Sequence, residues 1–172
     1  MVFARDQLTE LYRHMEWADA KVWRAVPGGN RDDDRLRTLL LHIHVVQRAF
    51  LCVWTHQPID DVFRTAEQLT TLADIRSWAQ PYYRDALAFV EQLTDEQLAA
   101  AIALPWAGQL AQQLGCDPAP PTLGDTGFQV TSHSTYHRGQ VNARLRELGG
   151  EPPLVDYIAW IWFGKPHAEW GT

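Results

Sequence analysis

The sequence contains very little lysine. Only Lys21 and Lys165 occur in 172 residues, and no Lys or Arg lies between Arg84 and Arg138. The formal net charge is −6. A nucleic-acid-binding surface needs clustered cations against phosphates, and an anionic membrane surface attracts the same groups. The charge pattern therefore argues against nucleic acid and against a membrane as partners.

Cysteine is also scarce, because Cys52 and Cys116 are the only two and form no CxxC motif or disulfide framework. The N-terminal residues carry a charge at Arg5 and lack the apolar core of a signal peptide. The longest uncharged stretch, residues 97–116, is rich in glutamine and is unlike a membrane span. We expect one cytoplasmic domain over residues 1–172.

Signals for β-strands are weak along the whole chain, and helical periodicity dominates. Four long segments place apolar residues three and four positions apart, namely residues 6–26, 33–56, 72–93 and 122–148. The second segment is apolar nearly all round, so it is expected to be central and buried. Four long helices with short joints predict an all-α fold, a four-helix bundle.

Local signals predict how these helices begin, end and connect. Pro27-Gly28-Gly29-Asn30 is expected to end the first helix, and Pro81 predicts a kink or a break in the third. The capping-box pattern of residues 94–97 predicts a short extra helix. Residues 102–121 are interrupted by proline and glycine, which predicts an irregular connection before the last long helix. Residues 156–163 are expected to form a final aromatic helix or turn.

Two of the seven histidines, His133 and His137, lie four residues apart on the predicted last helix. This spacing places both on one face, close enough to bind one metal ion. His137 falls between Val130 and Val141 on the apolar stripe, so both imidazoles are expected to point inward. Burying two imidazoles costs several kcal/mol unless they find partners, either a metal ion or hydrogen bonds.

The second helix offers His42 and His44, which cannot both face inward because they are two residues apart. His42 shares the apolar side with Leu39 and Val46, whereas His44 shares a wetter side with Arg48. We therefore predict His42 as the third metal ligand and an outward position for His44. Hydrogen-bonded core histidines are the alternative to a three-histidine site.

The remaining histidines are expected to lie outside the site. His14 is predicted to be hydrogen-bonded or solvated rather than a fourth contact, and His56 and His167 are predicted to be solvated. Several aromatic residues either line a pocket mouth or pack in the core and at an interface, and packing is favoured. They are Tyr12, Trp17, Trp160 and Trp162.

Residues next to His137 suggest supporting roles. Gln140 lies three positions beyond it on the same side, so it is predicted either to hydrogen-bond behind the metal ligand or to pack between helices. Arg138 points away from the ligand stripe and is expected to form a salt bridge or a dimer contact. Gly139 is expected to allow a close approach of helices, since glycine otherwise weakens a helix by about 1 kcal/mol.

The run His133-Ser-Thr-Tyr-His137-Arg138-Gly139-Gln140 has the form HxxxHRGQ, and His42 lies in an upstream Leu-x-His-Ile context. In these motifs the chain resembles the DinB/YfiT-like metalloenzymes. Residues 17–19 and 156–158 resemble weaker motifs of the same family, so that the resemblance extends over nearly the whole chain.

The resemblance implies a four-helix bundle of up-down-down-up type in which His42, His133 and His137 hold a divalent metal ion. The metal is commonly nickel or zinc, with iron as a further choice for imidazole ligands. It also implies a homodimer. The family name refers to expression after DNA damage and does not imply DNA binding. Two departures are an insert at residues 106–121 and Gln47, where an acidic residue often stands.

Characterised relatives in the family include S-transferases that use low-molecular-weight thiols and a maleylpyruvate isomerase. Three neutral imidazoles would leave the metal ion an open position for a metal-bound water or thiolate. We therefore predict a metal-dependent enzyme acting on a small-molecule substrate, a thiol S-transferase by analogy. The alternatives are a non-catalytic metal-binding stress-response protein and a metal-free helical dimerisation module.

Overall fold

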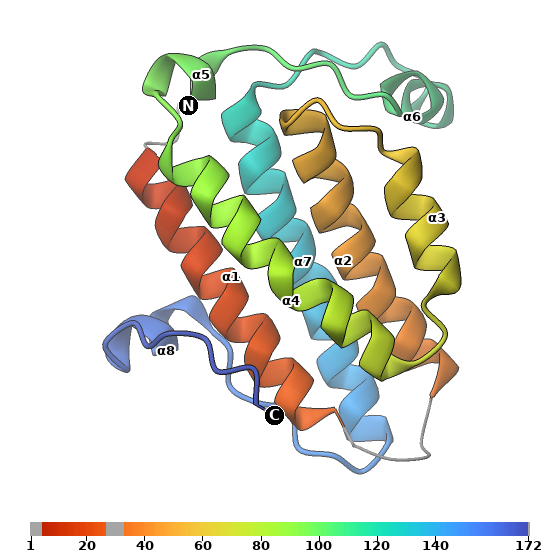
Figure 1. Ribbon diagram of the computed structural model, residues 1–172, viewed down its shortest axis with the longest axis vertical. Helices are drawn as coiled ribbons and strands as arrows, with labels where there is room; N and C mark the ends of the chain where they lie inside the picture. Colours follow the sequence, from red (N-terminus) through yellow and green to blue (C-terminus); the bar gives the residue numbers. More distant parts are fainter. Residues whose placement is uncertain (1–4, 27–32, 172) are drawn as a thin grey trace.

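The computed structural model describes residues 5–26 and 33–171, and over these residues it is all-helical (Figure 1). The helices of this part of the chain are α1 (Arg5–Ala25), α2 (Asp34–Trp54), α3 (Asp60–Gln68), α4 (Leu72–Glu91), α5 (Asp95–Ala99), α6 (Ala107–Leu114), α7 (Leu123–Glu147) and α8 (Tyr157–Trp162). The described residues form no β-strand, only a single isolated bridge between Ala101 and Thr122. The prediction of an all-α fold is confirmed.

The four long helices α1, α2, α4 and α7 pack as a bundle. α1 contacts α4 and α7, and α2 contacts the same two helices. In Figure 1, α1 and α7 run in one direction and α2 and α4 run in the other. This is the up-down-down-up arrangement that the family resemblance implied.

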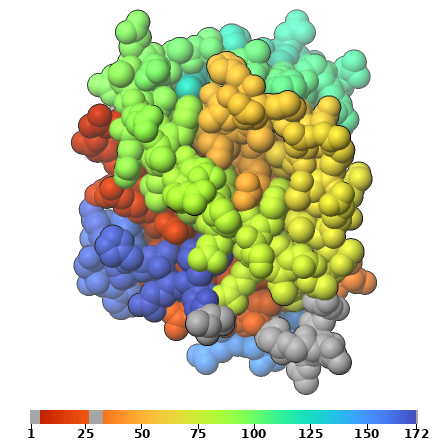
Figure 2. All heavy atoms as spheres, in the orientation of Figure 1, coloured from red at the N-terminus to blue at the C-terminus, as the bar shows by residue number. Residues whose placement is uncertain are grey.

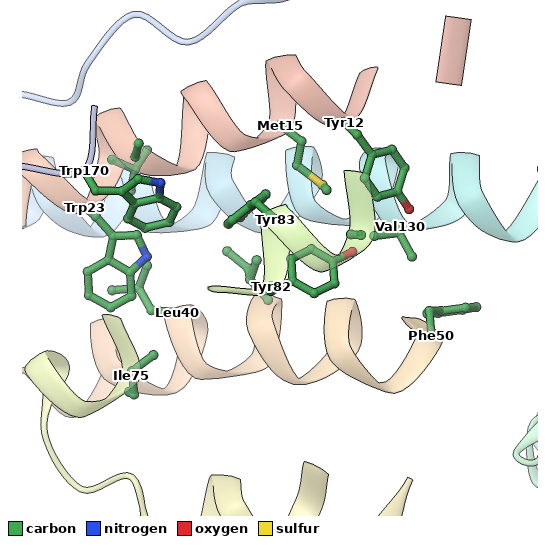
Figure 3. Packing of buried hydrophobic residues seen from close by; sticks show 14 of the residues in the cluster. Tyr12, Met15, Trp23, Leu40, Phe50, Ile75, Tyr82, Tyr83, Val130 and Trp170 are labelled. Atoms are coloured by element: carbon green, nitrogen blue, oxygen red, sulfur yellow. The ribbon is translucent and has the colours of Figure 1, made fainter. Parts of the chain in front are cut away.

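Tryptophan supplies much of the core. Five of the eight tryptophans are buried, namely Trp17, Trp23, Trp54, Trp160 and Trp170. Trp54 stacks on Phe89 with ring centroids 5.8 Å apart. The rings of Trp170 and Tyr83, both labelled in Figure 3, have their centroids 5.4 Å apart. The unusual tryptophan content is therefore used mainly for packing.

The C-terminal segment covers one side of α1. Trp17 of α1 and Trp160 of α8 form a small apolar cluster separate from the main core, and the indole of Trp160 donates to the carbonyl of Pro166. Figure 2 shows this segment, in blue, beside the N-terminal helix. The predicted final aromatic helix is confirmed as α8.

Three local predictions differ from the structure. α3 was not predicted, and residues 107–114 of the expected irregular connection form α6. α3 and α6 are only nine and eight residues long, and Val62 is the only residue that they bury, so each is too short for its periodicity to be recognised in the sequence. α4 continues through Pro81 without a break. The predicted stop at residues 27–30 lies outside the described residues.

The close helix approach predicted at Gly139 occurs elsewhere on α7. Nothing lies within 4 Å of a Cβ built on Gly139, whereas a Cβ on Gly127 would lie 2.9 Å from Cδ2 of Leu8. A Cβ on Gly124 would lie 3.1 Å from the carbonyl oxygen of Leu98. Glycine therefore allows the close approach of α1 and of the residues of α5 to the first half of α7.

Asp33 connects the start of α2 to the end of α7. Its Oδ1 caps α2 by accepting from the backbone N–H of Leu36 at 2.8 Å. The guanidinium of Arg144 donates to both carboxylate oxygens, with Nε–Oδ1 at 2.9 Å and Nη2–Oδ2 at 2.5 Å. These hydrogen bonds, that of Arg144 foremost, lower the pKa of Asp33 from 3.8 to about 2.

We predict that Asp33→Ala lowers the free energy of unfolding by about 1 kcal/mol at pH 7, as loss of a helix cap does. Because the pKa of Asp33 is lowered in the folded state, its stabilisation is present above pH 4 and is lost as the pH falls from 4 toward 2. Urea unfolding of both proteins at several pH values measures the difference, which should shrink over that range.

Asp34→Ala is the matched control, because Asp34 is largely exposed and pairs only with Arg37 one turn away. Its effect should stay within about 0.5 kcal/mol. An equal effect of the two substitutions, or a difference at Asp33 that does not change with pH, would contradict this account.

Candidate metal centre

Three histidines from two helices meet at the surface where α2 and α7 pack together. His42 comes from the middle of α2, and His133 and His137 come from α7. Nε2 of His42 lies 3.2 Å from Nε2 of His133, and one ring nitrogen of each histidine lies within 4.8 Å of the others. The structure thus brings together the three predicted ligands; that they bind a metal ion stays a prediction.

The donor set fits a divalent metal ion. Two imidazole nitrogens on a tetrahedral zinc ion, with bonds of about 2.0–2.1 Å, lie about 3.3 Å apart, close to the 3.2 Å between His42 and His133. Among the described residues, no Cys, Asp, Glu or fourth His joins the group. Three protein ligands leave a coordination position free, which is typical of catalytic rather than structural zinc sites.

The inward prediction required the histidines to lie inside the core of the bundle. In the structure, all three lie at its edge instead. His42 is exposed, and His133 and His137 are half-buried. The outward prediction for His44 is wrong, because this side chain is only 1% exposed. α2 carries apolar residues on nearly every side. The sequence pattern therefore did not reveal which face of α2 packs in the core.

Gln140 orients the ring of His137. Its Oε1 lies 2.7 Å from Nδ1 of His137. An amide oxygen only accepts hydrogen bonds, so Nδ1 carries the proton and Nε2 presents its lone pair to a metal ion. The hydrogen-bonding role predicted for Gln140 is the one the structure supports. Nδ1 of His133 is buried and has no hydrogen-bond partner among the described residues.

Burial and mutual repulsion favour the neutral form of the site. Partial burial, followed by the nearby charge of His137, lowers the pKa of His42. The same causes, with His42 added, lower the pKa of His133 to about 4. Both rings are therefore neutral near pH 7, which is the protonation state that binds a metal ion.

Directly behind the site, Arg138 is buried rather than placed at a surface or a dimer contact. Its side chain is 2% exposed and forms an ion pair with Asp19 of α1, which is 4% exposed. Nη2 of Arg138 also donates to Oγ1 of Thr135 at 3.0 Å. The salt bridge that we predicted is thus present, in the core.

A chain of hydrogen bonds extends from this ion pair to His44. The indole of Trp23 donates to Nε2 of His44 at 3.0 Å, so Nδ1 of His44 carries the proton and donates to Oε1 of Gln47 at 2.8 Å. Nε2 of Gln47 then donates to Oδ2 of Asp19 at 3.0 Å and to Oγ of Ser134 at 3.1 Å.

Tyr83 of α4 also donates to Oδ2 of Asp19, so the carboxylate is bound by groups from three other helices. We call Asp19, His44, Gln47, Tyr83, Ser134 and Arg138 the core polar network. Burial lowers the pKa of His44 and raises that of Tyr83, which keeps both side chains neutral. This network was not predicted from the sequence, in which Gln47, in place of an acidic residue, was the visible signal for it.

His14 is hydrogen-bonded, as predicted, through Nε2 to the carbonyl oxygen of Val155 at 2.9 Å. It lines a cavity of about 720 Å³ between α1, α7 and residues 152–157, which none of the three clustered histidines lines. Tyr12, Trp17 and Trp160 are buried as packing residues, whereas Trp162 is exposed. His56 and His167 are exposed, as predicted.

These features define a helical bundle with a three-histidine cluster. The DinB family model matches residues 128–169, which contain the HxxxHRGQ run and α8. This match confirms the resemblance over that segment. The searches of curated proteins and of solved structures found no match.

We predict that Gln140→Ala weakens zinc binding about 10- to 100-fold, as loss of a hydrogen bond to a ligating histidine typically does. Gln140→Glu should strengthen it, because a carboxylate acceptor makes the imidazole a better donor to the metal ion. Competition with a chromophoric zinc chelator measures both affinities at one pH.

Gln129→Ala serves as the control, since Gln129 lies exposed on the same helix, and no side-chain hydrogen bond is seen for it among the described residues. Its zinc affinity should equal that of the unmodified protein. If Gln140→Ala binds zinc equally well, the contact between Gln140 and His137 does not orient a metal ligand.

Proposed function

We propose that this protein is a metal-dependent enzyme that transfers a low-molecular-weight thiol to a small electrophile. The observation that carries the proposal is the cluster of three histidines with no fourth protein ligand among the described residues. A structural metal ion is normally closed by four protein ligands, whereas a catalytic one retains a position for a reactant.

The residues of the site have two roles, metal binding and orientation of a metal ligand. His42, His133 and His137 would hold the ion, and Gln140 fixes the ring orientation of His137. A divalent ion bound there would supply Lewis acidity that favours the ionised form of a thiol or of water. The three ligands are uncharged, so the protein does not neutralise the positive charge that supports this effect.

Access to the cluster supports a small-molecule reactant. His42 is exposed, so a solute can reach the group from the surface of the bundle. Tyr136 stands beside His137, with ring centroids 5.0 Å apart, and its side chain is 66% exposed. We assign Tyr136 to the mouth of the site, where its ring can contact the apolar part of a substrate.

The proposed reaction is a substitution at an electrophilic carbon. The thiol loses its proton to solvent, its sulfur forms a bond to carbon, and the leaving group departs with the electron pair of the broken bond. The thiol is more acidic than water, so ionisation near neutral pH needs a smaller pKa shift. The proposal includes a reducing cytoplasm, in which such thiols persist. Cys52 and Cys116 form no disulfide in the structure, which is compatible with that setting.

We predict that the zinc- or nickel-loaded protein accelerates chloride displacement from a chlorinated dinitrobenzene by a low-molecular-weight thiol. His42→Ala should lower the rate at least about 10-fold, since it removes one metal ligand. His56→Gln should leave the rate unchanged, because His56 is exposed beyond the end of α2. The absorbance of the thioether product gives the rates.

Thiol binding provides a second readout that does not depend on the choice of electrophile. Adding thiol to the cobalt-loaded protein should produce a sulfur-to-cobalt charge-transfer band that is absent in His42→Ala. If a panel of low-molecular-weight thiols neither produces the band nor reacts, the transferase proposal is wrong, and a metal-binding role without thiol chemistry replaces it.

A further inference from the structure

The two helices that carry the three histidines are connected, directly behind the site, by one buried amide. Gln47 of α2 is fully buried, and its Nε2 donates to Oγ of Ser134 on α7 at 3.1 Å. Ser134 is itself fully buried and directly follows His133 in the chain. The hydrogen bond between Gln47 and Ser134 therefore joins α2 to α7 immediately beside a candidate ligand.

Helix geometry relates this contact to the second helix. Gln47 lies five residues after His42, which corresponds to about 140° around the axis and about 7.5 Å along it. Gln47 thus lies in the core while His42 is exposed at the edge of the bundle. A rotation or shift of α2 that moved His42 away from His133 would also break the contact between Gln47 and Ser134.

Hydrogen-bond directions fix the orientation of the Gln47 amide. The proton on Nδ1 of His44 requires an acceptor, so Oε1 of Gln47 points toward His44 at 2.8 Å. Nε2 then has two protons, and its two nearest acceptors are Asp19 at 3.0 Å and Ser134 at 3.1 Å. The hydroxyl of Tyr83 at 3.3 Å and the sulfur of Met15 at 3.7 Å lie farther away. A flipped amide would place Nε2 against an N–H group and Oε1 against a carboxylate, so one arrangement is strongly preferred.

We infer that Gln47 is a positioning residue for the metal site: through Ser134 and Asp19 it sets the register of α2 against α7, and so the distance between His42 and His133. This inference rests on the proposed metal-binding function. Gln47 contacts none of the three clustered histidines and acts on them only through the helices.

The test compares two hydrogen bonds that both join α2 to α7. Ser134→Ala removes the bond beside His133, and Gln47→Met replaces the amide by an apolar side chain of similar length. Thr126→Val is the control, because buried Thr126 accepts a hydrogen bond from the indole of Trp54 on α2 at 3.0 Å, two turns away from His133.

We predict that Gln47→Met weakens zinc binding by about 10-fold or more, that Ser134→Ala weakens it by a smaller factor, and that Thr126→Val leaves it unchanged. Chelator competition gives the affinities, and the visible spectrum of the cobalt-loaded proteins reports ligand geometry. The spectrum should change in Gln47→Met and stay the same in Thr126→Val. Circular dichroism identifies the variants that fold.

The outcomes separate this inference from the proposal it rests on. If the unmodified protein binds no metal ion, both are overturned. If it binds one, while folded Gln47→Met and Ser134→Ala match it in affinity and spectrum, only the positioning role is overturned. A loss of affinity in Thr126→Val equal to that in Ser134→Ala would overturn it as well, because any contact between α2 and α7 would then suffice. If Gln47→Met does not fold, the comparison of Ser134→Ala with Thr126→Val decides.

Discussion

The buried ion pair between Asp19 and Arg138 constrains the rest of the bundle. Both side chains are almost completely removed from water, and charges in that position are tolerated only when every hydrogen-bonding group has a partner. Tyr83 and Gln47 donate further hydrogen bonds to the carboxylate of Asp19. The chain must therefore bring α1, α2, α4 and α7 together in one arrangement. Removing one partner of such a pair costs about 3–5 kcal/mol, which makes alternative packings of the helices unfavourable.

This constraint also acts on the backbone that carries two of the three histidines. His133 and His137 directly precede Ser134 and Arg138, two members of the core polar network. Each member anchors the backbone beside a candidate ligand, whose own side chain is half-buried at the edge of the bundle. A metal site at the edge of a bundle gains access for reactants, and the polar residues behind it supply the rigidity that a binding site needs.

The sequence predicted the helices and the clustered histidines for identifiable reasons. The spacing of His133 and His137 is a local property of one helix and could be read directly. His42 was selected on the assumption that it faces the core, and the structure places it in the cluster although it is exposed. The core polar network could not be read, because Asp19 and Arg138 are 119 residues apart and no periodicity connects them. α3 and α6 were missed because helices of nine and eight residues are too short for a periodic pattern to be recognised.

We propose that His42, His133 and His137 together bind one divalent metal ion with an open coordination position. Elemental analysis of protein purified without a histidine tag tests it most directly, with His42→Ala measured in parallel. We predict one divalent ion per chain in the unmodified protein and loss of that ion in His42→Ala, with the helical circular dichroism spectrum retained. A protein that contains no stoichiometric metal, or that retains the same metal content in His42→Ala, would contradict the account.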